Sequence, residues 1–178
     1  GLDLEEFGSL NDIFETSFIK FCSLDAYSNM GHEVTFDDVD QLSLQFAAYL
    51  QFKLGLQMGD KVAIMMPNLL QYPIVLLGIL RAGLTVVNVN PLYTGPELSY
   101  QLKDSESKAI VVLSNFAHIL QAILPETHVE HVIVTDVADM LPFPQNKIVN
   151  FIVKHVKKIV PKWHIPTAIS FLSVIKGA

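Results

Sequence analysis

The sequence predicts an α/β fold, a doubly wound and mostly parallel sheet flanked by helices, with a small N-terminal β-hairpin and a basic amphipathic C-terminal helix. Three observations support it. Apolar runs of strand length recur along the chain, segments with helical spacing separate them, and proline or glycine stands at many of their ends. Strands that alternate with helices pair in parallel through crossovers, and ligands bind near their carboxyl ends. The four runs are residues 62–66, 84–89, 109–113 and 131–135.

The first third of the chain predicts a helix, a hairpin and a second helix. Residues 10–21 carry apolar side chains at helical spacing, as in a helix that packs on a core. Residues 24–27 and 33–36 flank a turn that contains Gly31, which favours a β-hairpin. Thr35 and Asp38 have the spacing of a capping box for a helix that continues to Gly55.

The pattern of residues 61–94 predicts a strand, a helix and a second strand. Pro67 ends the first strand, because proline cannot continue a ladder of hydrogen bonds. We expect Asn68 to cap the following helix, with Gln71 reaching back to it, and Gly83 to end that helix. The two strands should lie parallel, joined by a right-handed crossover.

The pattern then repeats towards the middle of the chain. Thr94 and Glu97 predict a second capping box, for a helix that runs to about Lys103. Another helix is expected from Ser114 to Pro125. The chain thus presents four apolar strands alternating with helices.

Charge divides the chain into two parts. All 18 acidic residues lie at or before Asp139, whereas the 12 basic residues divide six and six about that point. Residues 136–145 form a candidate linker with two prolines. We therefore expect an α/β unit over residues 1–139 and a basic amphipathic helix with its connection over residues 140–178. The asymmetry suggests a tail that meets an anionic surface.

The tail predicts one amphipathic helix over residues 147–160, ended by Pro161. A broad apolar arc holds His155 among aliphatic residues and Phe151, and lysines and Asn150 fill the narrower arc. Trp163, beside Lys162, belongs to a residue type that favours interfaces. The candidates for contact with a membrane surface are Lys147, Lys154, Lys157, Lys158, Lys162 and Trp163.

Composition suits a folded domain. Hydrophobic residues make up 51% of the 178 residues and charged residues 17%, which argues against disorder. No apolar stretch approaches the roughly 20 residues of a membrane-spanning helix, and no signal-peptide pattern opens the chain. Cys22 is the sole cysteine and is expected to be a small core residue in a reducing compartment. We expect a cytoplasmic protein.

Several motifs resemble those of one enzyme family. VTFDDV at residues 34–39 and GILRAGLTVVNVNP at residues 78–91 resemble two motifs in the N-terminal part of the AMP-forming acyl-CoA synthetases. Within that superfamily, MMPNLLQYP, NVNPLYT, ELSYQ, SNFAHIL and NFIVKHVKKIVPKWHIPTAISF are most similar to the bacterial long-chain fatty acyl-CoA synthetases. The resemblance covers nearly all residues after about Leu10.

The resemblance implies a ligase that activates a long-chain fatty acid with ATP and transfers the acyl group to coenzyme A, with Mg²⁺ neutralising phosphate charge. The chain is too short for such an enzyme, so we expect an N-terminal fragment that serves as scaffold and is inactive alone. The family's phosphate loop, its ribose-binding acid and its adenylation lysine would lie beyond Ala178. We therefore assign no catalytic, cofactor-binding or metal-ligating residue, and expect no nucleic-acid partner; a homodimer is a candidate assembly.

Two interpretations of the basic helix stay open. Either it lies on the anionic inner face of the membrane, helped by about 1 kcal/mol for each lysine near the surface, or it covers the rest of the enzyme with its apolar arc. The alternative to a ligase fragment is a free-standing membrane-surface binding module that acts through this helix. A nucleotide-binding redox domain is disfavoured, because the scattered glycines form no phosphate-cradling loop.

Other polar residues have ordinary explanations. Glu130 and His131 are adjacent in a strand and point to opposite faces, so with His128 they make a poor metal site. Asn90 precedes Pro91 and is typical of a turn.

Overall fold

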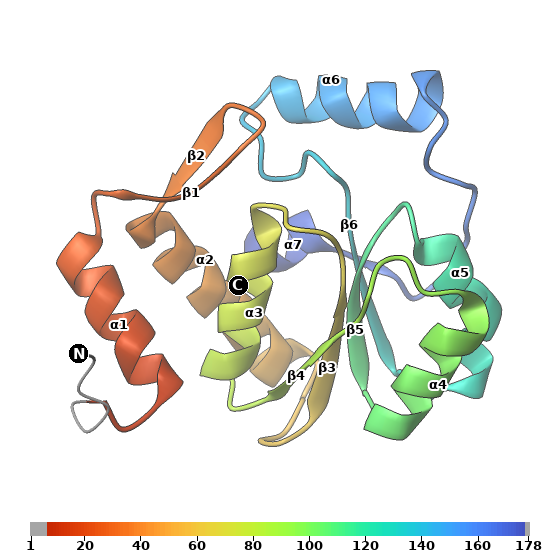
Figure 1. The fold of residues 1–178 in the computed structure, drawn as a ribbon, viewed down its shortest axis with the longest axis horizontal. Helices are drawn as coiled ribbons and strands as arrows, with labels where there is room; N and C mark the ends of the chain where they lie inside the picture. Colours follow the sequence, from red (N-terminus) through yellow and green to blue (C-terminus); the bar gives the residue numbers. More distant parts are fainter. Residues whose placement is uncertain (1–6, 177–178) are drawn as a thin grey trace.

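The computed structural model describes residues 7–176, which form three layers with a parallel sheet in the middle (Figure 1). The sheet has five strands in the order β4-β3-β5-β6-β7, and all neighbouring pairs are parallel. The doubly wound α/β prediction is confirmed. The strands are β3 (Lys61–Met65), β4 (Thr85–Asn88), β5 (Ala109–Leu113), β6 (His131–Thr135) and β7 (Ile169–Ser170).

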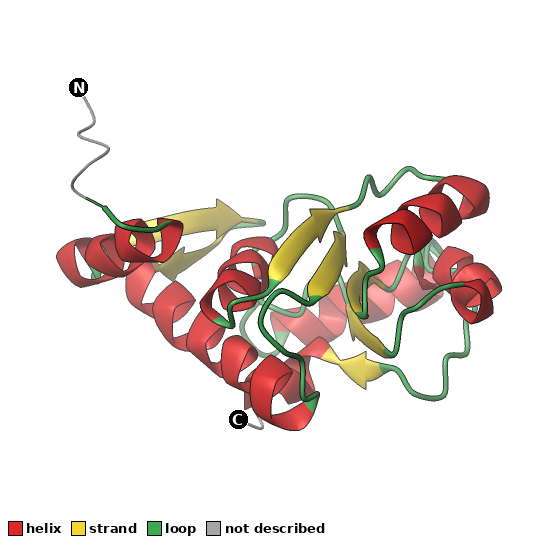
Figure 2. Cartoon of the chain, turned by 90° about the horizontal axis from the view of Figure 1, so that it is seen from below, coloured by secondary structure: helices red, strands yellow, loops and turns green. Residues whose placement is uncertain are grey.

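Helices cover both faces of this sheet. One face carries α2 (Phe36–Ala48), α3 (Gln71–Arg81) and α7 (Phe171–Lys176), and the other carries α4 (Gly95–Ser105) and α5 (Ala117–Ile123). The π-helical segment η1 (Tyr49–Lys53) extends α2, and the 3₁₀ turn η2 (Leu124–Glu126) extends α5. The helix α1 (Leu10–Phe21) packs outside α2 and α3. The predicted hairpin, β1 (Asp25–Asn29) and β2 (His32–Thr35), forms a separate antiparallel pair beside these helices (Figure 2).

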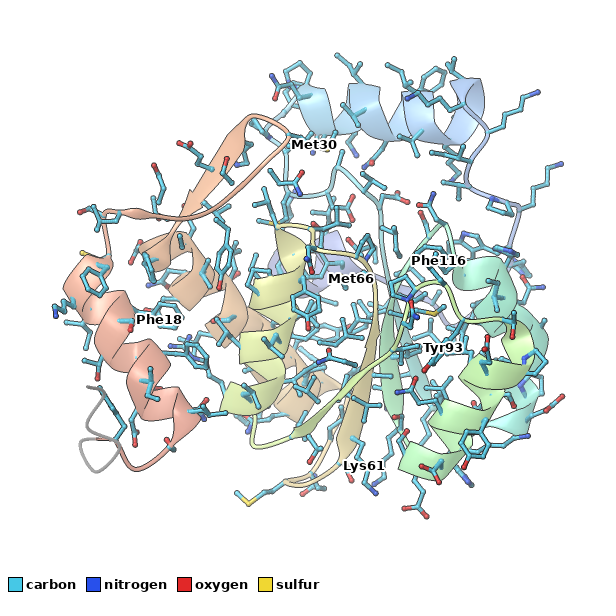
Figure 3. The ribbon with its side chains drawn as sticks, in the orientation of Figure 1. Phe18, Met30, Lys61, Met66, Tyr93 and Phe116 are labelled. Carbon is cyan, nitrogen blue, oxygen red and sulfur yellow. The ribbon has the colours of Figure 1, made fainter. Side chains whose placement is uncertain are left out.

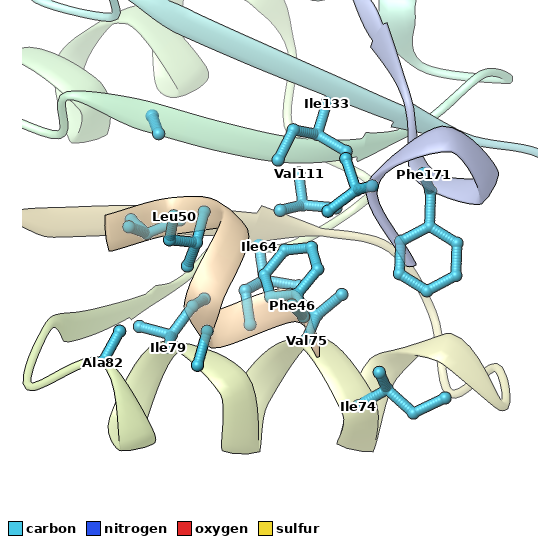
Figure 4. Close-up of a cluster of buried hydrophobic side chains, with 14 of the residues drawn as sticks. Phe46, Leu50, Ile64, Ile74, Val75, Ile79, Ala82, Val111, Ile133 and Phe171 are labelled. Atoms are coloured by element: carbon cyan, nitrogen blue, oxygen red, sulfur yellow. The ribbon is translucent and has the colours of Figure 1, made fainter. Parts of the chain in front are cut away.

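The three central strands, β3, β5 and β6, are mostly apolar because both of their faces are buried, whereas the edge strands β4 and β7 are more exposed. Val62 and Ile64 of β3 face the α2 and α3 layer, whereas Ala63 and Met65 face α4 and α5. Figure 4 shows the first of these cores, where Phe46 of α2 lies against Ile64. The aromatic rings of Phe46 and Phe171 lie 6.1 Å apart in the same core.

Both predicted capping boxes are present. Thr35 and Asp38 bond reciprocally at the start of α2, and Thr94 and Glu97 do so at the start of α4. Gly55, with φ of +70°, takes the left-handed conformation expected after a helix end.

Three local predictions are wrong. Asn68 does not cap α3, which begins after Leu70 without a side-chain cap, because Gln71 bonds instead to the end of β6. Cys22 is exposed, since it stands beyond the last turn of α1 rather than on the packed stripe. The tail helix ends at Val156 rather than Val160, and Lys158 reverses the chain with φ of +50°.

A close approach of two helices fixes the α2 and α3 layer. A Cβ on Gly78 would lie 2.8 Å from Cδ1 of Phe46 and 2.9 Å from the carbonyl oxygen of Ser43. Arg81, one turn on, pairs with Asp40 of α2 and lies over the ring of Phe18 in α1 at 4.9 Å. Gly78 therefore sets the distance at which these contacts form.

We predict that Gly78→Ala lowers the free energy of unfolding by about 1–3 kcal/mol, the usual range for overpacking a core. The loss should occur although alanine has the better helix propensity by about 1 kcal/mol. Gly95→Ala is the matched control, since its Cβ would lie 3.5 Å from Cγ2 of Ile123, an ordinary contact. Urea unfolding of both variants measures the effect, and equal stabilities would contradict it.

Candidate functional site

A polar network lies at the carboxyl end of β6. The side chain of Gln71 donates to Oγ1 of Thr135 at 3.0 Å and to the carbonyl of Asp136 at 2.9 Å. Thr135 in turn donates to Oδ2 of Asp139 at 3.0 Å, and the same oxygen accepts from the backbone N–H of Asp136 at 2.8 Å. The network joins the first turn of α3 to the loop after β6.

Asp139 carries this network onward to the tail helix. Its Oδ1 accepts from Nδ2 of Asn150 at 3.1 Å, and Oδ1 of Asn150 accepts from the backbone N–H of Ala138 at 2.9 Å. Asp139 is buried, and burial raises the pKa of its carboxyl group above the ordinary value, although three of these hydrogen bonds oppose the shift. The helix is thus attached to the sheet through polar contacts.

The tail helix comprises α6 (Gln145–Phe151) and the π-helical segment η3 (Ile152–Val156). It lies across the carboxyl edge of the sheet rather than on a face (Figure 1 and Figure 3), and side chains extend from it both toward and away from the layers below. Asn150 faces the protein, whereas Phe151 is 60% exposed and Val156 is 66% exposed. Most of the predicted apolar arc therefore points outward, whereas Val149 and Val153 of the same arc are half-buried. Its exposed members are Ile148, Phe151, Ile152, Val156 and, just beyond the helix, Ile159.

A cleft of about 920 Å³ opens between η3, the segment that follows it and α5. We call it the lysine cleft. Two bonds hold its walls together: Nδ2 of Asn115 donates to the carbonyl of Ile159 at 3.1 Å, and the backbone N–H of His164 donates to Oε1 of Gln121 at 2.6 Å. The lining residues are Gln121, Lys154, His155, Lys158, Val160, Pro161, Lys162, Trp163 and His164.

Positive charge in the lysine cleft is not neutralised by ion pairs. Among residues 7–176 the four ion pairs all lie before residue 139, and none involves a lysine of the tail. No carboxylate lines the cleft. A smaller cleft of about 340 Å³ on the sheet side of α6 is mixed, because Lys147 and Lys154 face Asp136 and Asp139 there. The lysine cleft is thus suited to an anion.

The structure brings together four of the six predicted site residues. Lys154, Lys158, Lys162 and Trp163 line the lysine cleft, Lys147 lines the smaller one, and Lys157 lines neither. Trp163 is half-buried and packs partly against the core beside α5. The sequence pattern missed His164 and Gln121, which reach the cleft only through the fold, and Asp139, whose side chain had no motif around it.

Two further findings concern metal ligands and membrane-spanning helices among the described residues. Residues 7–176 contain no group of three or more histidine, cysteine or acidic side chains placed to hold a metal ion. Within the same range, no helix is both long and apolar enough to cross a membrane.

The fold is shared with solved structures of CoA ligases. The chain belongs to the family of AMP-binding enzymes, whose family model matches residues 14–169. A structure of an anthranilate CoA ligase in complex with anthranoyl-AMP superimposes with a TM-score of 0.74 at 20% identity, over 94% of this chain and 27% of the other. At that identity the likeness concerns the fold alone.

Several relatives bear one name, long-chain-fatty-acid–CoA ligase. The protein of Escherichia coli O6:H1 is 53% identical over 171 residues, 96% of this chain and 30% of its own length. That of Yersinia pestis is 51% identical over 98% of this chain and 31% of its own length. A crystal structure of a long-chain-fatty-acid–CoA ligase from Archaeoglobus fulgidus is 27% identical, with a TM-score of 0.65, over 71% of this chain and 27% of the other. The chain therefore spans about a third or less of each relative.

We predict that Asp139 makes the protein less stable as the pH rises. Because its folded pKa is raised, its contribution to stability is fully present below the ordinary value of 3.8 and is lost as the pH rises through the folded pKa. Asp139→Asn does not titrate there. In urea unfolding from about pH 4 to pH 8, the free energy of unfolding of the variant should therefore rise relative to that of the wild type as the pH rises.

Glu97→Gln is the control, because hydrogen bonds from Thr94 lower the pKa of Glu97. Its contribution has the opposite sign: it is present above the ordinary value of 4.5 and is lost as the pH falls. A constant difference between Asp139→Asn and the wild type over the whole range would contradict the prediction.

Proposed function

We propose that this chain forms the N-terminal portion of a long-chain-fatty-acid–CoA ligase. The observation that carries the proposal is identity of 51–53% over 96–98% of the chain to proteins of that name. About half of all positions agree over the five strands and the four crossovers that join them, which is far more than a shared fold requires. A free-standing membrane-surface module gains no support from these relatives.

In the proposed reaction the carboxylate of a fatty acid attacks the α-phosphorus of ATP and pyrophosphate leaves. The thiol of coenzyme A then attacks the acyl carbon and AMP leaves. Mg²⁺ would neutralise phosphate charge during the first step. We assign residues 7–176 the role of scaffold, since their polar groups at the carboxyl edge bond to one another and hold elements in place. The reacting groups would come from the rest of the enzyme.

A chimera tests this function. We predict that residues 1–178, put in place of the matching segment of the Escherichia coli ligase, support formation of palmitoyl-CoA within about tenfold of the parent rate, because cores tolerate substitutions that keep volume and pattern. The isolated chain should give no exchange of pyrophosphate into ATP with palmitate.

The matched control is the same chimera with Gly78→Leu, which the contact with Phe46 leaves no room for. It should lose activity together with cooperative unfolding. A first chimera that unfolds cooperatively like the parent yet makes no palmitoyl-CoA would overturn the proposal, as would exchange by the isolated chain.

We also propose that the tail helix docks on an anionic membrane surface, the inner face of the membrane for a cytoplasmic protein. The supporting observation is its orientation: Ile148, Phe151, Ile152 and Val156 of the apolar arc point away from the described residues, and lysines flank them. An interfacial helix buries such an arc among lipid headgroups, where each nearby lysine adds about 1 kcal/mol. A fatty acid held in a bilayer would then lie near the enzyme. Association of two copies stays a prediction.

Phe151→Asp should abolish flotation of the protein with anionic vesicles at low salt, because it places a charge in the middle of the exposed arc. Phe52→Asp is the matched control, since Phe52 is 82% exposed on η1 and lies away from the tail helix. Both variants should keep the unfolding temperature of the wild type. Equal flotation of the two variants would rule out docking through α6.

A further inference from the structure

We propose that the lysine cleft binds the headgroup of a phospholipid that carries a phosphate monoester, so that the protein selects such lipids rather than negative charge in general. The inference rests on the membrane docking proposed above and adds a specific ligand to it. It starts from the charge of the cleft: Lys154, Lys158 and Lys162 line it without an ion pair or a lining carboxylate. Lys154 also borders the smaller cleft that holds Asp136 and Asp139, so Lys158 and Lys162 are the lysines that belong to the lysine cleft alone.

The cleft adjoins the apolar arc, and one residue belongs to both. His155 lines the cleft, and its ring lies 4.9 Å from the ring of Phe151 in the exposed arc. A ligand that reaches both surfaces therefore needs an anionic group joined to an apolar part. A phospholipid at the surface of a bilayer has that form, with its headgroup above the acyl chains.

The donors fit a monoester better than a diester. A phosphate monoester carries a charge of about −1.5 to −2 at neutral pH and three terminal oxygens, whereas the diester phosphate of a common anionic lipid carries one charge. Each lysine ammonium offers three donors on a flexible stem, so three lysines can share one group of three oxygens. Trp163, which is half-buried, supplies an amphipathic wall of the same cleft.

The experiment compares two kinds of vesicle at matched surface charge, one with phosphatidic acid and one with phosphatidylglycerol, each in phosphatidylcholine. The full chain should bind the phosphatidic acid vesicles at least about fivefold more tightly, the factor expected for 1 kcal/mol at one added lysine contact. Equal binding would overturn this inference and leave docking intact. Binding to neither would overturn docking and this inference with it.

The variants separate the cleft from the general charge of the helix. Lys162→Gln and Lys158→Gly should each remove the preference for phosphatidic acid. Lys157→Gln removes the same charge from a residue outside the cleft, so it should weaken binding to both vesicles equally. Lys158→Gly also controls for folding, because φ of +50° suits glycine and the variant should unfold at or above the wild-type temperature. A preference that survives both cleft variants would refute the assignment.

A competition experiment with a soluble phosphate ester distinguishes a lipid headgroup from a free phosphate ester as the ligand. Glycerol 3-phosphate carries the same monoester without acyl chains, so it should displace the protein from phosphatidic acid vesicles only at millimolar concentrations. Displacement at micromolar concentrations would mean that the cleft takes a free phosphate ester, and would overturn the lipid assignment.

Discussion

The sheet contains the five strands from β3 to β7, and all neighbouring strands in it are parallel. This parallel pairing is the constraint from which the rest of the structure follows. Parallel strands cannot be joined by tight turns, so each needs a crossover, and crossovers place helices on both faces. Both faces are then buried, which explains why residues 109–113 are apolar at every position. It also brings every carboxyl end to one edge, where the loops that follow the strands meet.

That common edge explains the unusual position of α6. The crossover from β6 to β7 leaves the sheet through Asp136 and Asp139, whose hydrogen bonds to Thr135 and Asn150 direct the chain across the edge. The faces of the sheet beside β7 are meanwhile covered by α7 on one side and by Ile165 and Trp163 on the other. Two layers are complete without α6, so its apolar arc has no place in the core of the described residues.

The sequence was sufficient where a pattern depends on neighbours in the chain. The strands, the helix over residues 10–21 and the two capping boxes follow from spacing alone, and the structure confirms them. It was insufficient where distant residues compete. Asn68 is a good cap by its own chemistry, but Gln71 bonds to Thr135, which is 64 residues away. The two-residue strand β7 escaped notice because it is defined by its pairing with β6 and by little else.

The same limit applied to the lysines. On a helical wheel they form a single polar arc, yet in the structure only some of them line the lysine cleft. Asn150 lies on the inner side because a buried carboxyl group offers it a partner, and this turns most of the apolar arc outward. A helix that covered the described layers would need the reverse orientation, with its lysines outermost. A membrane surface and the rest of the enzyme are both compatible with an arc that faces away from these layers. The rotation set by Asp139 places Lys154 and Lys158, but not Lys157, at the lysine cleft.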